Sequence, residues 1–352
     1  MSGVGLPIPR NSNEYLWVAS VIRSVEKLSG TPSRWNGELH EELRANAVGS
    51  ALDGGGMTVS VDNVLKPVAQ AYTAGRPLTE TELLELRDAV LTVVHEAYHL
   101  THEFGDENTP GGAPAYSPDA LVLEEGLTET WAHRNVDAVI QDIGLAQVQP
   151  ELTGVVSFDS YPAYTAATDE VVRGAAEISG LSPSQVRTAL EQADRTQRWA
   201  AVADVVIDER LADVMPPEHR DTVKTQLVQA MRPQLGDVVA VQKSELQSDV
   251  GKAIAGHQSA QRAVTALSTT TAGIENHYRD WYRQQAVQRA QQQQPTAATG
   301  PGQQREDVDH LRKFLGDQSL RPVRSEQSAD GSRPPDNLRQ LRPSRTHGQS
   351  ME

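Results

Sequence analysis

The stretch VVHEAYHL (93–100) contains two histidines four residues apart, His95 and His99, with Glu96 directly after the first. If the stretch is helical, both imidazoles stand on one face and can reach the same metal ion. Glu96 then lies close enough to a metal-bound water to take its proton. These residue types and this spacing favour zinc. The alternative is two ordinary histidines that hydrogen-bond to local carbonyl groups.

The sequence around this motif predicts a long, buried helix. Leucine, valine and alanine recur at helical intervals over residues 83–100, and Thr79 with Glu82 forms a capping box ahead of them. We expect the helix to run to about Phe104. Two unpaired imidazoles inside so apolar a helix would be unfavourable, which supports the metal site.

A catalytic zinc site needs a third protein ligand and an open coordination position. The next expected helix, over about 119–139, contains LVLEEGLTETWAHR. Glu125 and Glu129 share one face of this helix, whereas Glu124 projects about 100° away from Glu125. We expect Glu125 to bind zinc and Glu129 to accept a hydrogen bond from a metal-binding histidine, which fixes its tautomer. The alternative for this pair is a solvated acidic helix face.

The HExxH motif and the downstream glutamate together resemble the gluzincin metallopeptidases, in which a Glu from a second helix completes the metal site. The EGLTE segment that begins at Glu125 is similar to the Glu-Gly-hydrophobic segment of aminopeptidase N relatives. Glu129 matches the acid that thermolysin relatives carry one turn past their ligand. Glu124 stands where those families often have Asn. The resemblance covers residues 57–145.

The resemblance implies a zinc metallopeptidase that acts on a peptide or protein substrate. Zinc would polarise the scissile carbonyl and activate a water molecule, and Glu96 would take the proton and pass it to the leaving amine. It also implies an edge strand beside the HExxH helix that pairs with the substrate, for which residues 57–61 (MTVSV) are the candidate. Tyr161 and Tyr164 are candidate donors to the oxyanion, with core packing as the other role open to them.

One further family pattern and two further histidines bear on the identity of the metal ligands. A metzincin needs Gly at position 102 and His at position 105, whereas this chain has His102 and Gly105, so that class is excluded. His102 remains an alternative metal ligand, although a histidine at a helix end more often faces the terminal carbonyl groups. His133 is the other alternative ligand.

The composition of the whole chain excludes several classes of protein. The 352 residues carry a formal net charge of −15, which argues against a general nucleic-acid binder. The absence of cysteine excludes disulfides, thiolate metal ligands and a cysteine nucleophile. No apolar run is long enough to span a membrane, and the start MSGVGLPIPR has no secretory core. We therefore expect a cytoplasmic protein, with non-classical export as the alternative.

Helical periodicity dominates the chain, so we expect a mainly α fold whose zincin-like core holds a small sheet. Beyond the two helices above, helices are expected at 13–28, 161–179, 182–193, 196–214, 216–231 and 237–290.

The expected divisions are a catalytic core (1–145), a helical subdomain (146–235), a long C-terminal helix (236–293) and a disordered polar tail (294–352). Residues 295–352 hold nine Lys and Arg against eight Asp and Glu, so this segment carries +1 and the preceding residues carry −16. The C-terminal helix or the tail would suit a protein partner. Two other functions therefore stay open: a non-catalytic interaction protein with a structural zinc fold, and an exported effector protease.

Overall fold

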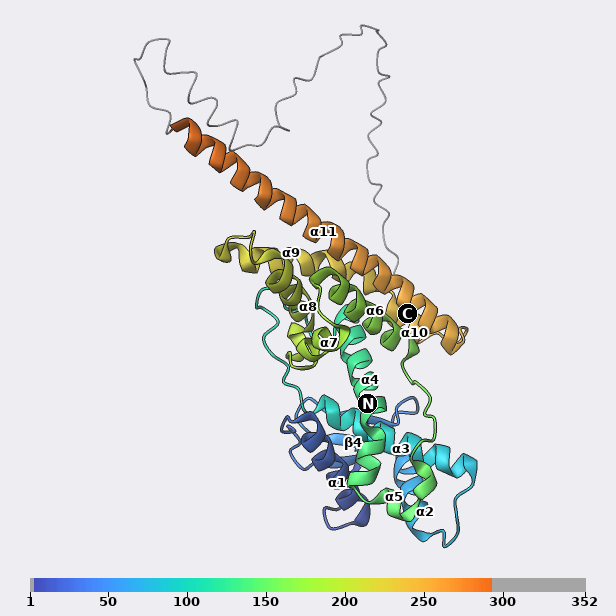
Figure 1. The fold of residues 1–352 in the computed structure, drawn as a ribbon. Helices are drawn as coiled ribbons and strands as arrows, with labels where there is room; N and C mark the ends of the chain where they lie inside the picture. Colours follow the sequence, from blue (N-terminus) through green and yellow to red (C-terminus); the bar gives the residue numbers. More distant parts are fainter. Residues whose placement is uncertain (1–2, 293–352) are drawn as a thin grey trace, which may run out of the picture. The chain divides into compact units, whose positions relative to one another are not determined.

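A computed structural model describes residues 3–292 of the chain (Figure 1). Helices make up most of this part, and one four-stranded sheet is formed near its N-terminus. The expected mainly α fold with a small sheet is therefore confirmed. The predicted disordered tail lies outside the described residues. Within residues 3–292, no helix combines the length and the apolar character needed to cross a lipid bilayer.

The N-terminal elements are the four strands of the sheet and three helices. The strands are β1 (Val4–Pro7), β2 (Leu39–Glu42), β3 (Gly49–Ala51) and β4 (Met57–Val59). The helices are α1 (Asn13–Ser29), α2 (Lys66–Thr73) and α3 (Glu80–His99), and a short π-helical turn, Val61–Leu65, leads into α2. Side chains of α1, α3, β2 and β4 form one hydrophobic cluster, to which the second half of α4 (Pro118–Asp142) also contributes.

The order of strands in the sheet corrects the expectation for residues 57–61. The order is β1-β2-β4-β3, so β4 lies between β2, which is parallel to it, and β3, which is antiparallel. Both backbone edges of β4 are therefore used, and the edge strand beside α3 is β3. The alternation in MTVSV correctly indicates a strand whose Met57 and Val59 are fully buried, but it carries no information about which strands pair with it.

Helix α3 begins as expected, with Thr79 and Glu82 forming the capping box. It ends at His99, five residues before the predicted end. The side chains of Thr101 and His102 both contact the carbonyl oxygen of Tyr98, at 2.7 and 3.1 Å. Polar side chains that bond to backbone groups in this way compete with continuation of the helix.

A second hydrophobic cluster is formed by the helices α6 (Pro162–Ser179), α7 (Pro183–Glu191), α8 (Arg198–Val206), α9 (Arg220–Met231), α10 (Val238–Gln242) and α11 (Asp249–Gln292). The short helix α5 (Leu145–Val148) instead contributes Leu145 to the first cluster. Short turns link these helices: the 3-10 turns η2 (Pro150–Leu152), η3 (Arg195–Gln197), η5 (Pro217–His219) and η6 (Arg232–Leu235), and the π-helical turn η4 (Ile207–Leu211). The first half of α4 belongs to this second cluster, so α4 connects the two (Figure 1). Division of the chain into domains at residues 145 and 235 stays a prediction.

The expected single helix over 237–290 is interrupted. Helix α10 ends at Gln242 and α11 begins at Asp249. Between them the Ser244 hydroxyl accepts from Leu246 N, and the Ser248 hydroxyl accepts from Gly251 N at 3.2 Å. The Ser248 hydroxyl satisfies a free N–H group at the start of α11, and the Ser244 hydroxyl satisfies one in the turn after α10. The apolar periodicity alone does not reveal these bonds.

A close contact between α4 and α6 depends on Gly126. A Cβ atom at this position would lie 2.6 Å from the carbonyl oxygen of Tyr164 and still closer to the Thr168 hydroxyl. We expect Gly126→Ala to lower the free energy of unfolding by about 1–3 kcal/mol, because the two helices would have to move apart. Gly273→Ala is the matched control, since a Cβ atom there meets nothing within 4 Å.

Denaturant unfolding measures both variants. Alanine at exposed helical position 273 should be neutral or stabilising by up to about 1 kcal/mol. Equal stability of Gly126→Ala and the unmodified protein would contradict the close contact.

Candidate metal centre

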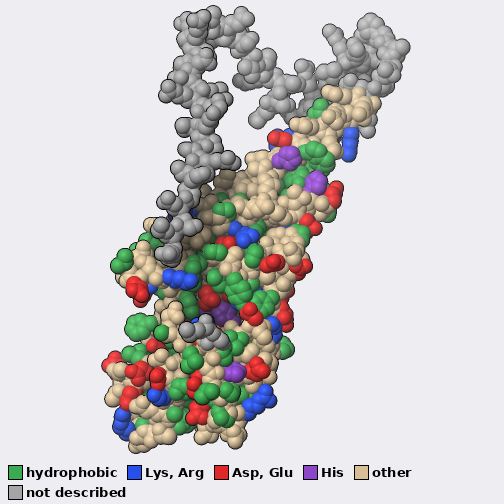
Figure 2. All heavy atoms as spheres, turned by 180° about the vertical axis from the view of Figure 1, so that it is seen from behind, with side chains coloured by type: hydrophobic (Ala, Val, Ile, Leu, Met, Phe, Trp, Pro, Cys, Tyr) green, Lys and Arg blue, Asp and Glu red, His purple; other side chains and the backbone are tan. Residues whose placement is uncertain are grey.

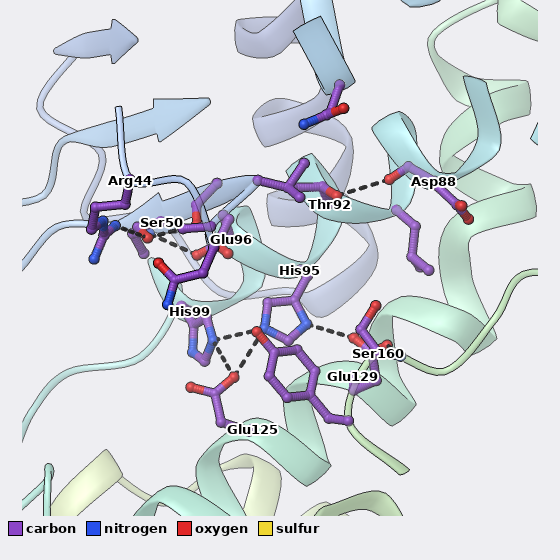
Figure 3. A pocket seen from close by; sticks show the side chains of 18 of the residues that line it. Arg44, Ser50, Asp88, Thr92, His95, Glu96, His99, Glu125, Glu129 and Ser160 are labelled. Carbon is purple, nitrogen blue, oxygen red and sulfur yellow. Dashed lines mark hydrogen bonds and ion pairs between the residues drawn. The ribbon is translucent and has the colours of Figure 1, made fainter. Parts of the chain in front are cut away.

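Helices α3 and α4 bring together the three residues predicted to bind zinc (Figure 3). His95 Nε2 lies 3.0 Å from His99 Nε2, because the two residues are one turn apart on α3. Glu125 comes from α4, and its Oε2 atom lies 3.2 Å from His95 Nε2 and 3.5 Å from His99 Nε2. One ligand atom from each residue thus points at a common position, as a metal ion requires.

The other nitrogen of each imidazole is held by a carboxylate. His95 Nδ1 lies 2.8 Å from Glu129 Oε2, and His99 Nδ1 lies 2.6 Å from Glu124 Oε1. Because a carboxylate only accepts, each Nδ1 is assigned as the N–H donor. Burial opposes protonation of the rings, but the neighbouring carboxylates raise the pKa of both His95 and His99 in the metal-free chain. A metal ion would therefore displace the Nε2 proton and bind the lone pair that it leaves. Two such lone pairs and a carboxylate oxygen then converge. This set of two nitrogens and one oxygen suits Zn²⁺.

The charge of Glu125 also suits a metal ligand. Burial alone would raise its pKa, but the neighbouring His99 and His95 outweigh burial and lower the pKa to about 2. Both histidines are buried. The group is therefore shielded from bulk water, in which the attraction between a cation and a carboxylate is weakest.

The structure places neither alternative ligand in this group. His102 Nε2 lies 2.8 Å from the carbonyl oxygen of Glu191 and Nδ1 lies 3.1 Å from that of Tyr98. Burial, helped by Arg198, lowers the pKa of His102 to about 4, so its ring is neutral at neutral pH. His133 instead contacts Glu129, with its Nε2 atom 3.1 Å from Oε1.

Glu124 has a role that the sequence analysis did not give it. Its carboxylate is fully buried and contacts His99, and its two oxygens also lie 2.9 Å from Arg195 Nε and 2.7 Å from Arg198 Nη1. Burial opposes ionisation of Glu124, but Arg198, His99 and Arg195 hold its pKa well below the ordinary value. The only signal in the sequence is an acid directly after the apolar run LVL.

Both carboxylates that hold the histidines should matter for metal affinity. We expect Glu129→Gln and Glu124→Gln each to weaken zinc binding by about 10-fold to 100-fold, because each imidazole loses the anion that orients it and raises its basicity. Competition titration with a chromogenic chelator measures the affinity. Glu85→Gln is the matched control, because Glu85 lines the same cavity on α3 at an exposed position. Unchanged affinity in both test variants would refute these roles.

The three residues lie in a cavity of about 950 Å³. Figure 2 shows histidine and acidic side chains together in a hollow on this face. Glu96 also lines the cavity, and its Oε2 atom accepts a hydrogen bond of 2.6 Å from Ala51 N of β3. The candidate general base is therefore next to the candidate ligands and is held by the edge strand.

Tyr161 and Tyr164 occupy different positions. Tyr161 lines the cavity and stacks on His95, with ring centroids 5.2 Å apart. Burial raises its pKa, and the charges of Glu125 and Glu96 raise it further, so the phenol keeps its proton. Tyr164 is buried in the second hydrophobic cluster, on the other side of Tyr161. Of these two tyrosines, Tyr161 is the one that lines the cavity and is the candidate to donate to a group in it.

The geometry thus gathers His95, Glu96, His99, Glu125 and Glu129, and leaves Tyr164 in the core. The roles predicted for these residues rest on their positions and chemistry. A search of family models, of curated proteins and of solved structures found no match to this chain.

Proposed function

We propose that this chain is a zinc-dependent peptidase in which His95, His99 and Glu125 hold the metal. The observation that carries the proposal is the convergence of three ligand atoms whose histidines are each fixed by a separate buried carboxylate. Glu96 adds a carboxylate in the same cavity that is not needed to hold a metal. A purely structural site needs ligands but no base, so the position of Glu96 favours catalysis over an interaction protein.

Each residue of the site has a separate role in the proposed peptide hydrolysis. Bound Zn²⁺ would polarise the scissile carbonyl and lower the pKa of a water molecule. Glu96 accepts a proton from the attacking water and passes it to the leaving amine. The hydrogen bond from Ala51 N keeps the Glu96 carboxylate on the cavity side of α3. Tyr161 donates to the carbonyl oxygen as negative charge develops on it.

The edge strand β3 provides backbone groups for an extended substrate. On the side of β3 that faces β4, Val48 O accepts from Ser60 N, and Leu52 N donates to Gly56 O. By the alternation of an antiparallel pair, the backbone groups of Gly49 and Ala51 point away from β4. Both residues line the cavity. Ala51 N already donates to Glu96 and Gly49 O accepts from the Ser50 hydroxyl, so Gly49 N and Ala51 O are the groups that β3 offers to a substrate. A peptide that pairs with this edge would lie along α3, with its carbonyl groups close to Glu96.

A peptide library assay with metal control tests the proposal. The purified chain is incubated with a diverse set of peptides and the products are identified by mass spectrometry. Cleavage should stop when a chelator removes the metal and should return on addition of Zn²⁺. A zinc-loaded chain that cuts none of the peptides would argue for the interaction protein instead.

A further inference from the structure

Arg195 is fixed in the wall of the candidate cavity. Its Nε atom lies 2.9 Å from Glu124 Oε1, and its guanidinium carbon lies 4.6 Å from the ring centre of Phe104 and 5.8 Å from that of Tyr116. The side chain is 11% exposed and lines the cavity. A guanidinium held between two rings and a carboxylate has little freedom left to lose when it binds a ligand.

The backbone around Arg195 is equally constrained. Arg195 N donates to Glu103 O at 3.0 Å, and Thr196 N donates to Phe104 O at 2.9 Å. Ala113 N donates to Thr196 O at 2.9 Å. The turn that carries Arg195 is thus bonded through Arg195 and Thr196 to the connection between α3 and α4, the two helices that supply the candidate ligands.

Two arginines contact the single carboxylate of Glu124, so one positive charge is not balanced there. Arg198 alone can balance this carboxylate, with Nη1 2.7 Å from Oε2. Arg198 is 2% exposed and is not part of the cavity lining. The unbalanced charge is therefore that of Arg195, at the cavity surface, where an anion would stabilise it.

The other arginine of the cavity lining has its charge satisfied. Arg44 contacts both oxygens of Glu42, with Nε 2.9 Å from Oε1 and Nη2 2.6 Å from Oε2. The remaining formally charged side chains of the lining are acidic: Asp62, Glu85, Asp88, Glu96, Glu125 and Glu129. An anionic group on a ligand is repelled by these acids. Within the described lining, Arg195 is the position that favours such a group.

Arg195 is also close to the metal ligands. Arg195 and His99 contact the same oxygen of Glu124, at 2.9 and 2.6 Å. A group bound by Arg195 therefore lies near the bond to be cut. On the basis of the proposed function, we propose that Arg195 binds a carboxylate of the substrate close to the scissile bond, in the two-pronged geometry that guanidinium and carboxylate favour. The α-carboxylate of a C-terminal residue or an acidic side chain would supply it.

Equilibrium binding tests the inference without hydrolysis. The Glu96→Gln chain keeps peptides intact and is titrated calorimetrically, with and without Zn²⁺. One pair of probes is acetyl-Ala-Ala-Ala as the free acid and as the amide. The other pair is the amide of acetyl-Ala-Asp-Ala and that of acetyl-Ala-Asn-Ala. In at least one pair, the dissociation constant of the carboxylate form should be lower than that of its neutral counterpart by a factor of about 10 or more. The pair that shows the difference identifies the source of the carboxylate.

Variants assign the preference to Arg195. On the same background, Arg195→Gln should abolish the preference, and Arg195→Lys should retain part of it because the charge remains without the two-pronged geometry. Arg44→Gln, the matched control, should leave it unchanged. Zinc affinity is measured in each variant.

Two outcomes would overturn the inference. One is equal binding of both forms in both pairs by the chain with Arg195. The other is a preference that survives in Arg195→Gln. If the unmodified chain shows the preference but cuts no peptide, the Arg195 site stands and the peptidase proposal fails.

Discussion

The variant Glu96→Gln is expected to retain its metal and to lose peptide hydrolysis by about 10² or more. Glutamine keeps the size of the side chain, and its amide oxygen can still accept the hydrogen bond from Ala51 N. It cannot accept a proton from water, so the general-base step is lost. The measurement is kcat/KM on a cleaved peptide, with zinc content determined on the same sample.

Glu85→Gln is the control for that experiment. It makes the same substitution at another acid of the cavity lining on the same helix. Activity within a few-fold of the unmodified protein is expected. If Glu96→Gln were equally active at full zinc occupancy, Glu96 would not be the base.

Tyr161→Phe is expected to lower kcat by about 10²–10³ while zinc affinity stays unchanged. The substitution removes only the hydroxyl, so the ring can still stack on His95. The lost donor would have stabilised charge that forms on the carbonyl oxygen, and single donors of this type contribute that much. Steady-state kinetics on a cleaved peptide measures the effect.

Tyr164→Phe is the matched control, because Tyr164 is the next ring in the stack but does not line the cavity. It should leave kcat within a few-fold. Equal losses in the two variants would indicate a shared structural role and would exclude Tyr161 as the oxyanion donor.

The sequence was most informative where the chemistry depends on spacing along one helix. Residues four apart share a face of a helix, so the sequence alone pairs His95 with His99 and Glu125 with Glu129. The same helical spacing places Glu124 on another face than Glu125 and indicates no hydrogen-bond or ion-pair partner for it. Its partners Arg195 and Arg198 are some 70 positions later in the chain, and only tertiary packing brings them to it.

The sheet shows a similar limit. The strand Met57–Val59 has the alternation of apolar residues that predicts a buried strand. The edge strand, Gly49–Ala51, has the sequence GSA and carries no apolar pattern at all. It is a strand because its backbone pairs with β4, and such pairing leaves no trace in the composition of three small residues. The predicted edge strand was wrong for this reason.

The central claim is that His95, His99 and Glu125 form a metal site, and metal titration tests it most directly. The metal-free chain and its His95→Ala, His99→Ala double variant are each titrated with Zn²⁺, and bound zinc is counted by elemental analysis. We expect about one zinc per unmodified chain and none bound specifically by the double variant, since two of three ligands are gone. Full zinc occupancy in the double variant, or no zinc in the unmodified chain, would contradict the account.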